Sequence, residues 1–163
     1  MNAAASQFRA IVLAGERPGG SPLAREFGVS AGVMVPVAGR PSLERVMQAV
    51  EASHAVEGGI VCGPPKAAVE SDTAMQSLLT SPWQWLAPAA GPAASALAAV
   101  EALDQFPALL TTGDHALLTP GIVDAFCHQA SLGRDADIVI GLVPHRLVKA
   151  AWPESRRTVL KFA

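Results

Sequence analysis

Residues 10–22 read AIVLAGERPGGSP, and this stretch decides the fold. Its first five residues are apolar and run into Gly15, which is typical of a short buried strand that ends in a loop. The loop is rich in glycine and proline, so its backbone N–H groups can come close to a bound phosphate. A strand that leads into such a loop is a usual opening for a protein with a parallel sheet.

Strand-like and helix-like segments alternate along the rest of the chain. Short apolar runs predict strands, and apolar residues spaced three or four apart predict helices. The predicted strands cover residues 10–14, 59–62, 81–86, 108–112 and 136–142, and another begins at residue 158. The predicted helices cover residues 42–53, 66–79, 93–103 and 120–132. This order predicts an α/β fold, a three-layer α/β/α sandwich with a mostly parallel sheet, formed by residues 1–163 as a single domain.

The composition is that of an ordinary globular domain. Half of the 163 residues are hydrophobic, and a formal net charge of −2 gives no electrostatic footprint for nucleic acid or for an anionic membrane. No apolar run reaches the roughly 18 residues of a membrane span, and the N-terminus lacks a signal-peptide pattern. We therefore expect a cytoplasmic protein with no nucleic-acid partner and no membrane partner. Cys62 and Cys127 lack metal-ligand spacing and are expected to be buried free thiols.

The loop after the first predicted strand is a candidate phosphate site. Ligands of parallel α/β sheets gather at the carboxyl ends of the strands, where this loop lies. Its backbone at Gly15, Gly19 and Gly20 can approach a ligand, and Arg17 and Arg25 can pair with phosphate oxygens. The loop matches neither the Walker A pattern nor the Gly-x-Gly-x-x-Gly dinucleotide pattern. An ordinary strand-to-helix connection is an equally good interpretation of this loop alone.

Asp114 is a candidate metal ligand. It follows the predicted strand at 108–112, and a carboxylate at that edge can take one position on Mg²⁺. The neighbouring His115 is a possible second ligand. The alternative is an aspartate and a histidine that hydrogen-bond within a turn.

The segment Gly91-Pro92-Ala93-Ala94-Ser95 introduces an alanine-rich helix. Its N–H groups and the Ser95 hydroxyl can face a base or a phosphate. A helix that simply starts with proline in its first turn fits the same residues.

Together these motifs resemble the nucleotidyltransferase superfamily with the GT-A-type, Rossmann-like fold. Within it, they are most similar to the NTP-transferase group that includes molybdenum-cofactor guanylyltransferases and sugar-phosphate nucleotidyltransferases. The family's opening Leu-Ala-Gly turn corresponds to residues 13–15, with Arg17 as the basic residue, and its Pro-Val-x-Gly-x-Pro segment corresponds to residues 36–41. Its metal-binding aspartate corresponds to Asp114, and its Gly-Pro-x-x-Ser segment to residues 91–95.

The resemblance implies transfer of a nucleoside monophosphate from a nucleoside triphosphate to a phosphorylated or pterin-type acceptor, with release of pyrophosphate. It implies Arg17 and Asp114 as catalytic residues, with Asp114 holding Mg²⁺. The nucleotide-binding residues that it implies are Leu13, Ala14, Gly15, Arg17, Gly19, Gly20, Arg25, Gly91, Pro92 and Ser95. The implied partners are the nucleoside triphosphate and a small-molecule acceptor, while the oligomeric state stays open.

Three departures from the family pattern predict a weak or inactive transferase. Glu16 stands where the family has a second glycine, and its carboxylate disfavours a polyphosphate beside it. Gly32 stands where the family has a lysine that stabilises the transferring phosphoryl group. The chain also ends soon after residue 158, where we expect the acceptor-binding part to be missing from a truncated protein. The alternative is a non-catalytic nucleotide-binding or interaction module that keeps the fold.

Overall fold

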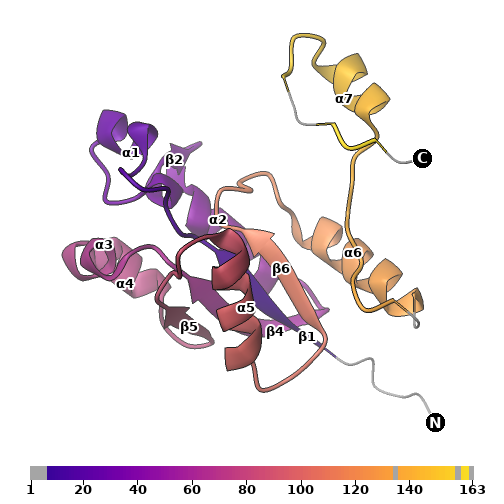
Figure 1. The fold of residues 1–163 in the computed structure, drawn as a ribbon, viewed down its shortest axis with the longest axis horizontal. Helices are drawn as coiled ribbons and strands as arrows, with labels where there is room; N and C mark the ends of the chain where they lie inside the picture. Colours follow the sequence, from indigo (N-terminus) through magenta and orange to yellow (C-terminus); the bar gives the residue numbers. More distant parts are fainter. Residues whose placement is uncertain (1–6, 134–135, 157–158, 162–163) are drawn as a thin grey trace. The chain divides into compact units, whose positions relative to one another are not determined.

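The computed structural model describes residues 7–133, 136–156 and 159–161. The chain divides into two compact units, Met1–Gln129 and Ala130–Ala163. The first contains a four-stranded sheet in the order β5-β4-β1-β6, in which all neighbouring strands run parallel (Figure 1). Its strands are β1 (Phe8–Leu13), β4 (Val56–Cys62), β5 (Trp83–Leu86) and β6 (Ala108–Thr112). The α/β fold with a mostly parallel sheet is confirmed, as are four of the predicted strands.

Helices cover both faces of this sheet and make the three layers. Helix α5 (Pro92–Ala102) packs on β1 and β4, where its Ala99 joins Ile11 and Ile60 in one apolar cluster (Figure 1). Because side chains alternate along a strand, Val12 and Val61 point to the opposite face. Helix α2 contacts β4 there and is buried along the face predicted from its apolar spacing. It covers Ser42–Glu51, two residues shorter than predicted.

The strands of the sheet end in register. Leu13 at the end of β1 pairs with Cys62 of β4 on one side and with Thr112 of β6 on the other. Cys62 pairs in turn with Leu86, the last residue of β5. The loops that follow all four strands therefore leave from one edge of the sheet.

Two glycines let β4 approach its neighbours closely. The pairing of β1 with β4 shifts register between Phe8 and Ala10, opposite Gly58 and Gly59. Gly58 has a φ of +60°, a backbone conformation that favours glycine. A Cβ atom at Gly59 would lie 2.0 Å from the carbonyl oxygen of Ala10. This irregular pairing thus requires glycine at both positions.

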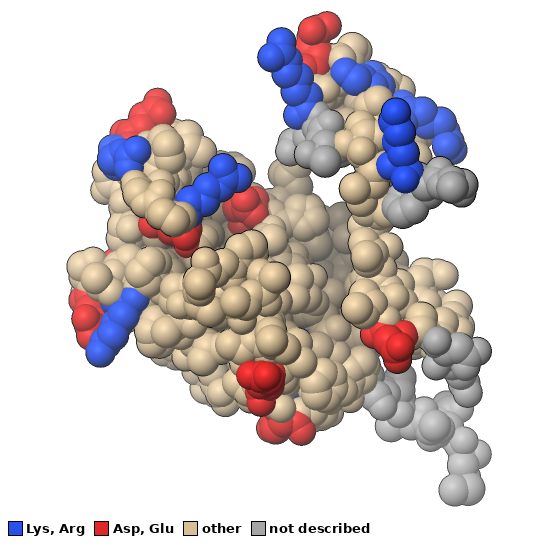
Figure 2. Space-filling view, viewed as in Figure 1, with Lys and Arg blue, Asp and Glu red and all other residues tan. Residues whose placement is uncertain are grey.

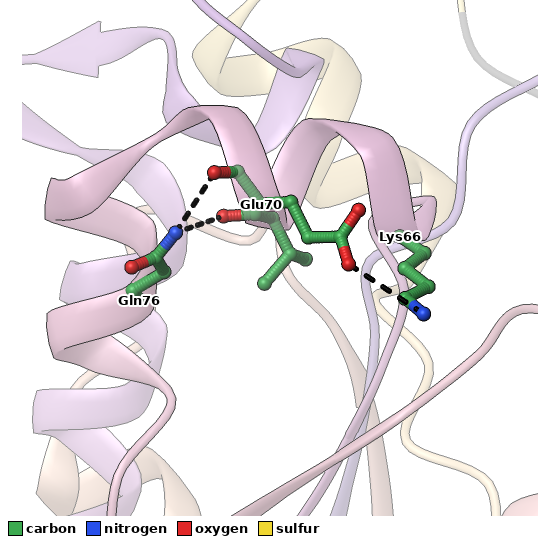
Figure 3. Close-up of polar contacts among 4 residues, drawn as sticks. Lys66, Glu70 and Gln76 are labelled. Carbon is green, nitrogen blue, oxygen red and sulfur yellow. Dashed lines mark hydrogen bonds and ion pairs between the residues drawn. The ribbon is translucent and has the colours of Figure 1, made fainter.

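The single helix predicted for residues 66–79 is wrong, because the structure forms two short helices. These are α3 (Lys66–Ser71) and α4 (Thr73–Leu78), and Asp72 between them is extended. The Asp72 carboxylate accepts hydrogen bonds from the N–H groups of Ala74 and Met75 and caps α4. The Gln76 amide donates to the carbonyls of Val69 and Glu70 at 3.0 Å each, which satisfies the end of α3 (Figure 3). The ion pair between Lys66 and Glu70 spans one turn of α3 in the same view.

Several short elements between β1 and α2 were not predicted. Helix α1 (Pro22–Phe27) begins at the cap Ser21 and ends at Gly28, which has a φ of +63°. The 3₁₀ helix η1 (Gly32–Met34) precedes an antiparallel pair of short strands, β2 (Pro36–Val37) and β3 (Arg40–Pro41). The Arg45 guanidinium of α2 donates to the carbonyls of Val37 and Ala38 and so holds this pair against α2.

Helix α6 (Pro120–Leu132) is present as predicted, and its first part belongs to the sheet-containing unit. The Asp124 carboxylate accepts hydrogen bonds from the Ser53 hydroxyl at 2.6 Å and from the His54 N–H at 2.9 Å. These bonds tie α6 to the connection between α2 and β4. Among the residues that the structure describes, no helix is long and apolar enough to cross a membrane.

The second unit contains helix α7 (His145–Ala151), which was not predicted. Its Lys149 ammonium donates to the carbonyls of Pro153 and Ser155 and holds the turn after the helix. Figure 2 shows lysine and arginine side chains gathered on this unit. The strand predicted for residues 136–142 is wrong, because these residues pair with no strand in the described part of the chain. The predicted start of a further strand, Thr158, lies outside the described residues.

We expect Gly59→Ala to lower the free energy of unfolding by about 3 kcal/mol, because the new methyl group would overlap the Ala10 carbonyl. Urea denaturation followed by circular dichroism measures this change. Gly121→Ala is the matched control, since a Cβ at Gly121 meets nothing within 4 Å. This control should be neutral or stabilising by up to about 1 kcal/mol. Equal stability of the two variants would contradict the close strand approach.

Stability should also depend on pH through Asp72. The hydrogen bond from the Ser30 hydroxyl, together with those from the α4 N–H groups, lowers the pKa of Asp72 below its usual 3.8. A carboxyl with a depressed pKa in the folded state stabilises the fold above its unfolded pKa, and this contribution is lost as the pH falls through the folded pKa.

Asp72→Asn keeps an acceptor for the helix cap but removes the charge. Thermal unfolding of wild type and variant should therefore differ most above about pH 5 and converge as the pH falls below 3.8. Comparison at equal pH cancels the titration of Asp124, whose pKa is also lowered, chiefly by the Ser53 hydroxyl. A difference that grows toward low pH would contradict this assignment.

Candidate functional site

The candidate site lies at the edge of the sheet where the four strands end. Gly63, which follows β4, packs directly on the start of the loop after β1: a Cβ built on it would lie 2.6 Å from the Gly15 nitrogen. A Cβ on Gly15 would in turn lie 3.5 Å from that of Pro88, which follows β5. After β6, Gly113 donates its N–H to the Leu13 carbonyl at 2.8 Å. The structure thus brings together the loops predicted to line this edge.

The loop after β1 turns tightly and leaves its glycines open. The Gly20 N–H donates to the Arg17 carbonyl at 3.0 Å, which closes a turn over residues 17–20. Gly19 and Gly20 both have positive φ angles, and a Cβ at Gly19 would meet nothing within 4 Å. The backbone at Gly15, Gly19 and Gly20 is therefore exposed at the edge, where a ligand can approach it.

The two arginines predicted to bind phosphate differ in their surroundings. Arg25, in α1, donates from Nη1 to the Gly19 carbonyl at 2.8 Å and so braces the loop. Arg17 is exposed, and its guanidinium makes no hydrogen bond or ion pair with any residue that the structure describes. Arg17 is thus the cation of this loop with all its donors available to an anion, while Arg25 already supports the backbone.

Glu16 and Gly32 are in direct contact. The Gly32 N–H donates to Glu16 Oε1 at 2.6 Å, so the carboxylate holds the loop after β1 to the start of η1. A Cβ at Gly32 would lie 2.9 Å from Ser21 Oγ and 3.4 Å from Glu16 Oε1. The sequence singled out both residues as separate departures from the family, but no local pattern showed that they form one contact.

Asp114 is exposed at the same edge, two residues beyond the end of β6. Its carboxylate makes no hydrogen bond or ion pair within the described residues, so its oxygens are available to a cation. Mg²⁺ binds through one or two carboxylates, with substrate phosphates and water as the other ligands. A single free carboxylate fits that pattern. Within the described residues, no group of three or more His, Cys, Asp or Glu side chains could hold a metal ion.

The predicted base-binding segment is held by a buried serine. Ser95 is 5% exposed, and its hydroxyl accepts a hydrogen bond from the Ala89 N–H at 3.0 Å. Gly91 caps the start of α5 and Pro92 is its exposed first residue. Burial raises the pKa of the Cys62 thiol, which lies 3.6 Å from the Ser95 carbonyl. Ser95 therefore fixes the loop after β5, whereas Gly91 and Pro92 lie nearer to solvent.

Two polar contacts that support the site were not found from the sequence. Ser21 Oγ accepts from the Ala24 N–H at 3.2 Å and fixes the end of the loop at the start of α1. Its position before Pro22 is a recognisable helix-start pattern. The Ser30 hydroxyl donates to Asp72 at 2.5 Å and ties the segment before η1 to α4. No sequence signal points to this second pair, because the two residues are 42 positions apart.

The fold and the edge described above define a class of protein: an α/β domain of the nucleotidyltransferase type. The chain belongs to the family of MobA-like NTP transferase domains, whose sequence model matches residues 10–158. The proposed relation to the nucleotidyltransferase superfamily is therefore confirmed. No curated protein matches the chain.

Solved structures of transferases share this fold. A hypothetical transferase from Thermus thermophilus is 27% identical, with a TM-score of 0.64 over 93% of this chain. A nucleotidyl transferase from Methanothermobacter thermautotrophicus is 20% identical, with a TM-score of 0.56 over 75% of this chain. A CMP:2-keto-3-deoxy-manno-octonic acid synthetase complexed with CTP is 10% identical, with a TM-score of 0.59 over 79% of this chain. The alignments cover 58%, 57% and 49% of those proteins, respectively, so this chain spans roughly half of their length.

We expect Ser95→Ala to loosen the loop after β5, because the Ala89 N–H loses its acceptor. The loss of one such hydrogen bond lowers the free energy of unfolding by about 1 kcal/mol. Hydrogen exchange at the Ala89 amide should become faster in the variant. Ser71→Ala is the control, because the Ser71 hydroxyl is exposed and bonds only to Ala68 of its own helix. Unchanged exchange at Ala89 would contradict the role given to Ser95.

Proposed function

We propose that this domain binds a nucleoside triphosphate at the carboxyl edge of its sheet. The observation that carries the proposal is the alignment of the strand ends, which gathers the open glycine loop after β1 and the free carboxylate of Asp114 at one edge. Membership of the MobA-like NTP transferase family supports the choice of ligand. The CTP complex of a structural relative is consistent with a nucleotide ligand for this fold.

In this proposal, each loop has a separate task. The N–H groups of Gly15 and Gly19 and the guanidinium of Arg17 receive phosphate oxygens, while the Gly20 N–H keeps the turn closed through the Arg17 carbonyl. The end of β1 at Leu13 and Ala14 sets the position of this loop, and Arg25 braces it through Gly19. The segment from Gly91 to Ser95 borders the base.

The reaction that we propose for such a site is transfer of the nucleoside monophosphate to a phosphorylated or pterin-type small molecule. An acceptor oxygen bonds to the α-phosphorus while the bond from that phosphorus to the bridging oxygen breaks, and pyrophosphate leaves. Asp114 would hold Mg²⁺, which neutralises charge on the phosphates when bound. The protein contributes mainly by orienting the ligand and by supplying donors around the phosphates.

We further propose that this transfer is slow in the present chain. The residue in the place of the family's lysine is Gly32, and its N–H is engaged by the Glu16 carboxylate. No side chain can extend from position 32 without displacing Ser21 or Glu16. The loop therefore lacks a cation at that place and carries an anion beside it, which disfavours charge build-up on a phosphoryl group. This contact favours the second candidate, a nucleotide-binding module without catalysis.

Nucleotide binding can be tested by thermal unfolding with each nucleoside triphosphate, with and without Mg²⁺. A ligand at 100 times its Kd stabilises the folded protein by about 2.7 kcal/mol. We expect Asp114→Asn to remove the increment that depends on Mg²⁺ and to leave the melting temperature of the free protein unchanged, because Asp114 is exposed. Asp137→Asn is the control for lost charge, because Asp137 is an exposed aspartate of the second unit. The absence of stabilisation by every nucleotide would contradict the proposed function.

Pyrophosphate release separates the two candidate functions. A slow or absent release, with binding intact, supports the module without catalysis. Release at about 1 s⁻¹ or faster, a normal enzyme rate, would contradict the proposal that transfer is slow.

A further inference from the structure

Glu16 is placed to act on the loop after β1 in two ways. Its Oε1 accepts the Gly32 N–H at 2.6 Å. Its Oε2 lies 3.9 Å from the place where a Cβ on Gly20 would stand, and Arg25 Nη1 lies 3.8 Å from the same place. The carboxylate and the guanidinium therefore approach Gly20 together, although no ion pair joins these two described residues. One oxygen of Glu16 is a structural acceptor, and the other borders the open backbone of the loop.

The hydrogen bond between Glu16 and Gly32 shapes the segment between β1 and η1. Ser21 Oγ, which caps α1, and Glu16 Oε1 both lie against Gly32. Gly32 has no positive φ, so glycine is required here by lack of space and not by backbone conformation. The loop thus depends on three groups that fit only as a set: the Glu16 carboxylate, the Ser21 hydroxyl and a residue 32 without a side chain.

The hydrogen bond from the Gly32 N–H holds the negatively charged Glu16 carboxylate in one position. A flexible glutamate could swing away from an incoming anion, but this one is half-buried and hydrogen-bonded at 2.6 Å. A unit negative charge held about 6 Å from another in water weakens binding about threefold. A nucleoside triphosphate carries about two more negative charges than a monophosphate. The Glu16 charge therefore weakens the binding of the triphosphate about tenfold more than the binding of the monophosphate.

We propose that Glu16 is a positioning and charge-selecting residue of this loop. Through Oε1 it holds the loop after β1 against Gly32, and through its fixed charge it favours a nucleotide with fewer anionic groups at the loop. In the absence of a divalent cation, Glu16 then weakens the binding of a nucleoside triphosphate more than the binding of the corresponding monophosphate. This selection rests on the proposed nucleotide site, whereas the positioning of the loop does not.

The test compares two variants of Glu16 by two measurements on the full chain. Titration calorimetry without divalent cations gives the Kd values for a nucleoside triphosphate and its monophosphate, and hydrogen exchange reports on the Gly32 amide. Glu16→Gln keeps an oxygen acceptor and removes the charge. We expect it to leave the Gly32 amide protected and to shift the affinity ratio about tenfold toward the triphosphate. Glu16→Ala removes the oxygen acceptor as well as the charge. We expect faster hydrogen exchange at the Gly32 amide and weaker binding of the triphosphate and of the monophosphate.

Glu26→Gln is the matched control, because Glu26 is an exposed glutamate on α1 and its removal changes the net charge equally. It should leave both measurements at the wild-type values. An affinity ratio that does not change in Glu16→Gln would overturn the charge selection, and so would an equal change in Glu26→Gln. Unchanged exchange at Gly32 in Glu16→Ala would overturn the positioning role.

Failure of the proposed function has a different signature. If neither wild type nor Glu16→Gln binds either nucleotide, the nucleotide site and the charge selection are both wrong. The exchange of the Gly32 amide still decides the positioning role in that case, because it needs no ligand.

Discussion

The structure depends on the backbone pairing of β1 with a strand on each side. Pairs such as Leu13 with Cys62 and Leu13 with Thr112 satisfy its N–H and C=O groups in the interior of the unit. A buried strand must have such partners, because unpaired backbone groups away from water are costly. The close approach at Gly59 and the apolar faces of α2 and α5 both serve this arrangement. The edge that carries the candidate site exists only because these strands end together.

At that edge, the connections after the strands pack closely through glycines, and the backbone of the loops stays exposed. Gly63 lies against Gly15, and Gly113 lies against Ala14, because the connections leave side by side from strands that are in contact. Glycine at these positions permits the close approach and leaves little side-chain bulk above the loops. The polar residues then divide into two groups. Ser21, Arg25 and Ser95 hold loops in place, while Arg17 and Asp114 have free polar atoms. This division is the physical basis for assigning ligand contacts to the second group.

Much of the fold could be predicted from the sequence, because local patterns of apolar residues decide where its main strands and helices form. The strands β1, β4, β5 and β6 follow short apolar runs, and α2 follows an apolar spacing of three and four residues. The local sequence pattern gave a wrong prediction where contacts with a distant part of the chain decide the secondary structure. Residues 136–142 are as apolar as a buried strand, yet a strand needs a neighbour's backbone, and these residues pair with none in the described part of the chain. Residues 66–79 contain enough helix formers for one helix, but Asp72 caps a second helix and bonds Ser30.

The sequence by itself determined the class of fold, the order along the chain of the four sheet strands and of helices α2, α5 and α6, and the types of residue available at the sheet edge. These follow from periodicity, from glycine and proline positions and from motif spacing, all of which act over short distances along the chain. Only the tertiary structure decided which side chains are already engaged. Glu16 and Gly32 are 16 residues apart, and their contact depends on the path of α1 and η1 between them. A hydrogen bond between distant residues has no signature in local sequence, because the fold of the intervening chain sets the distance between its two atoms.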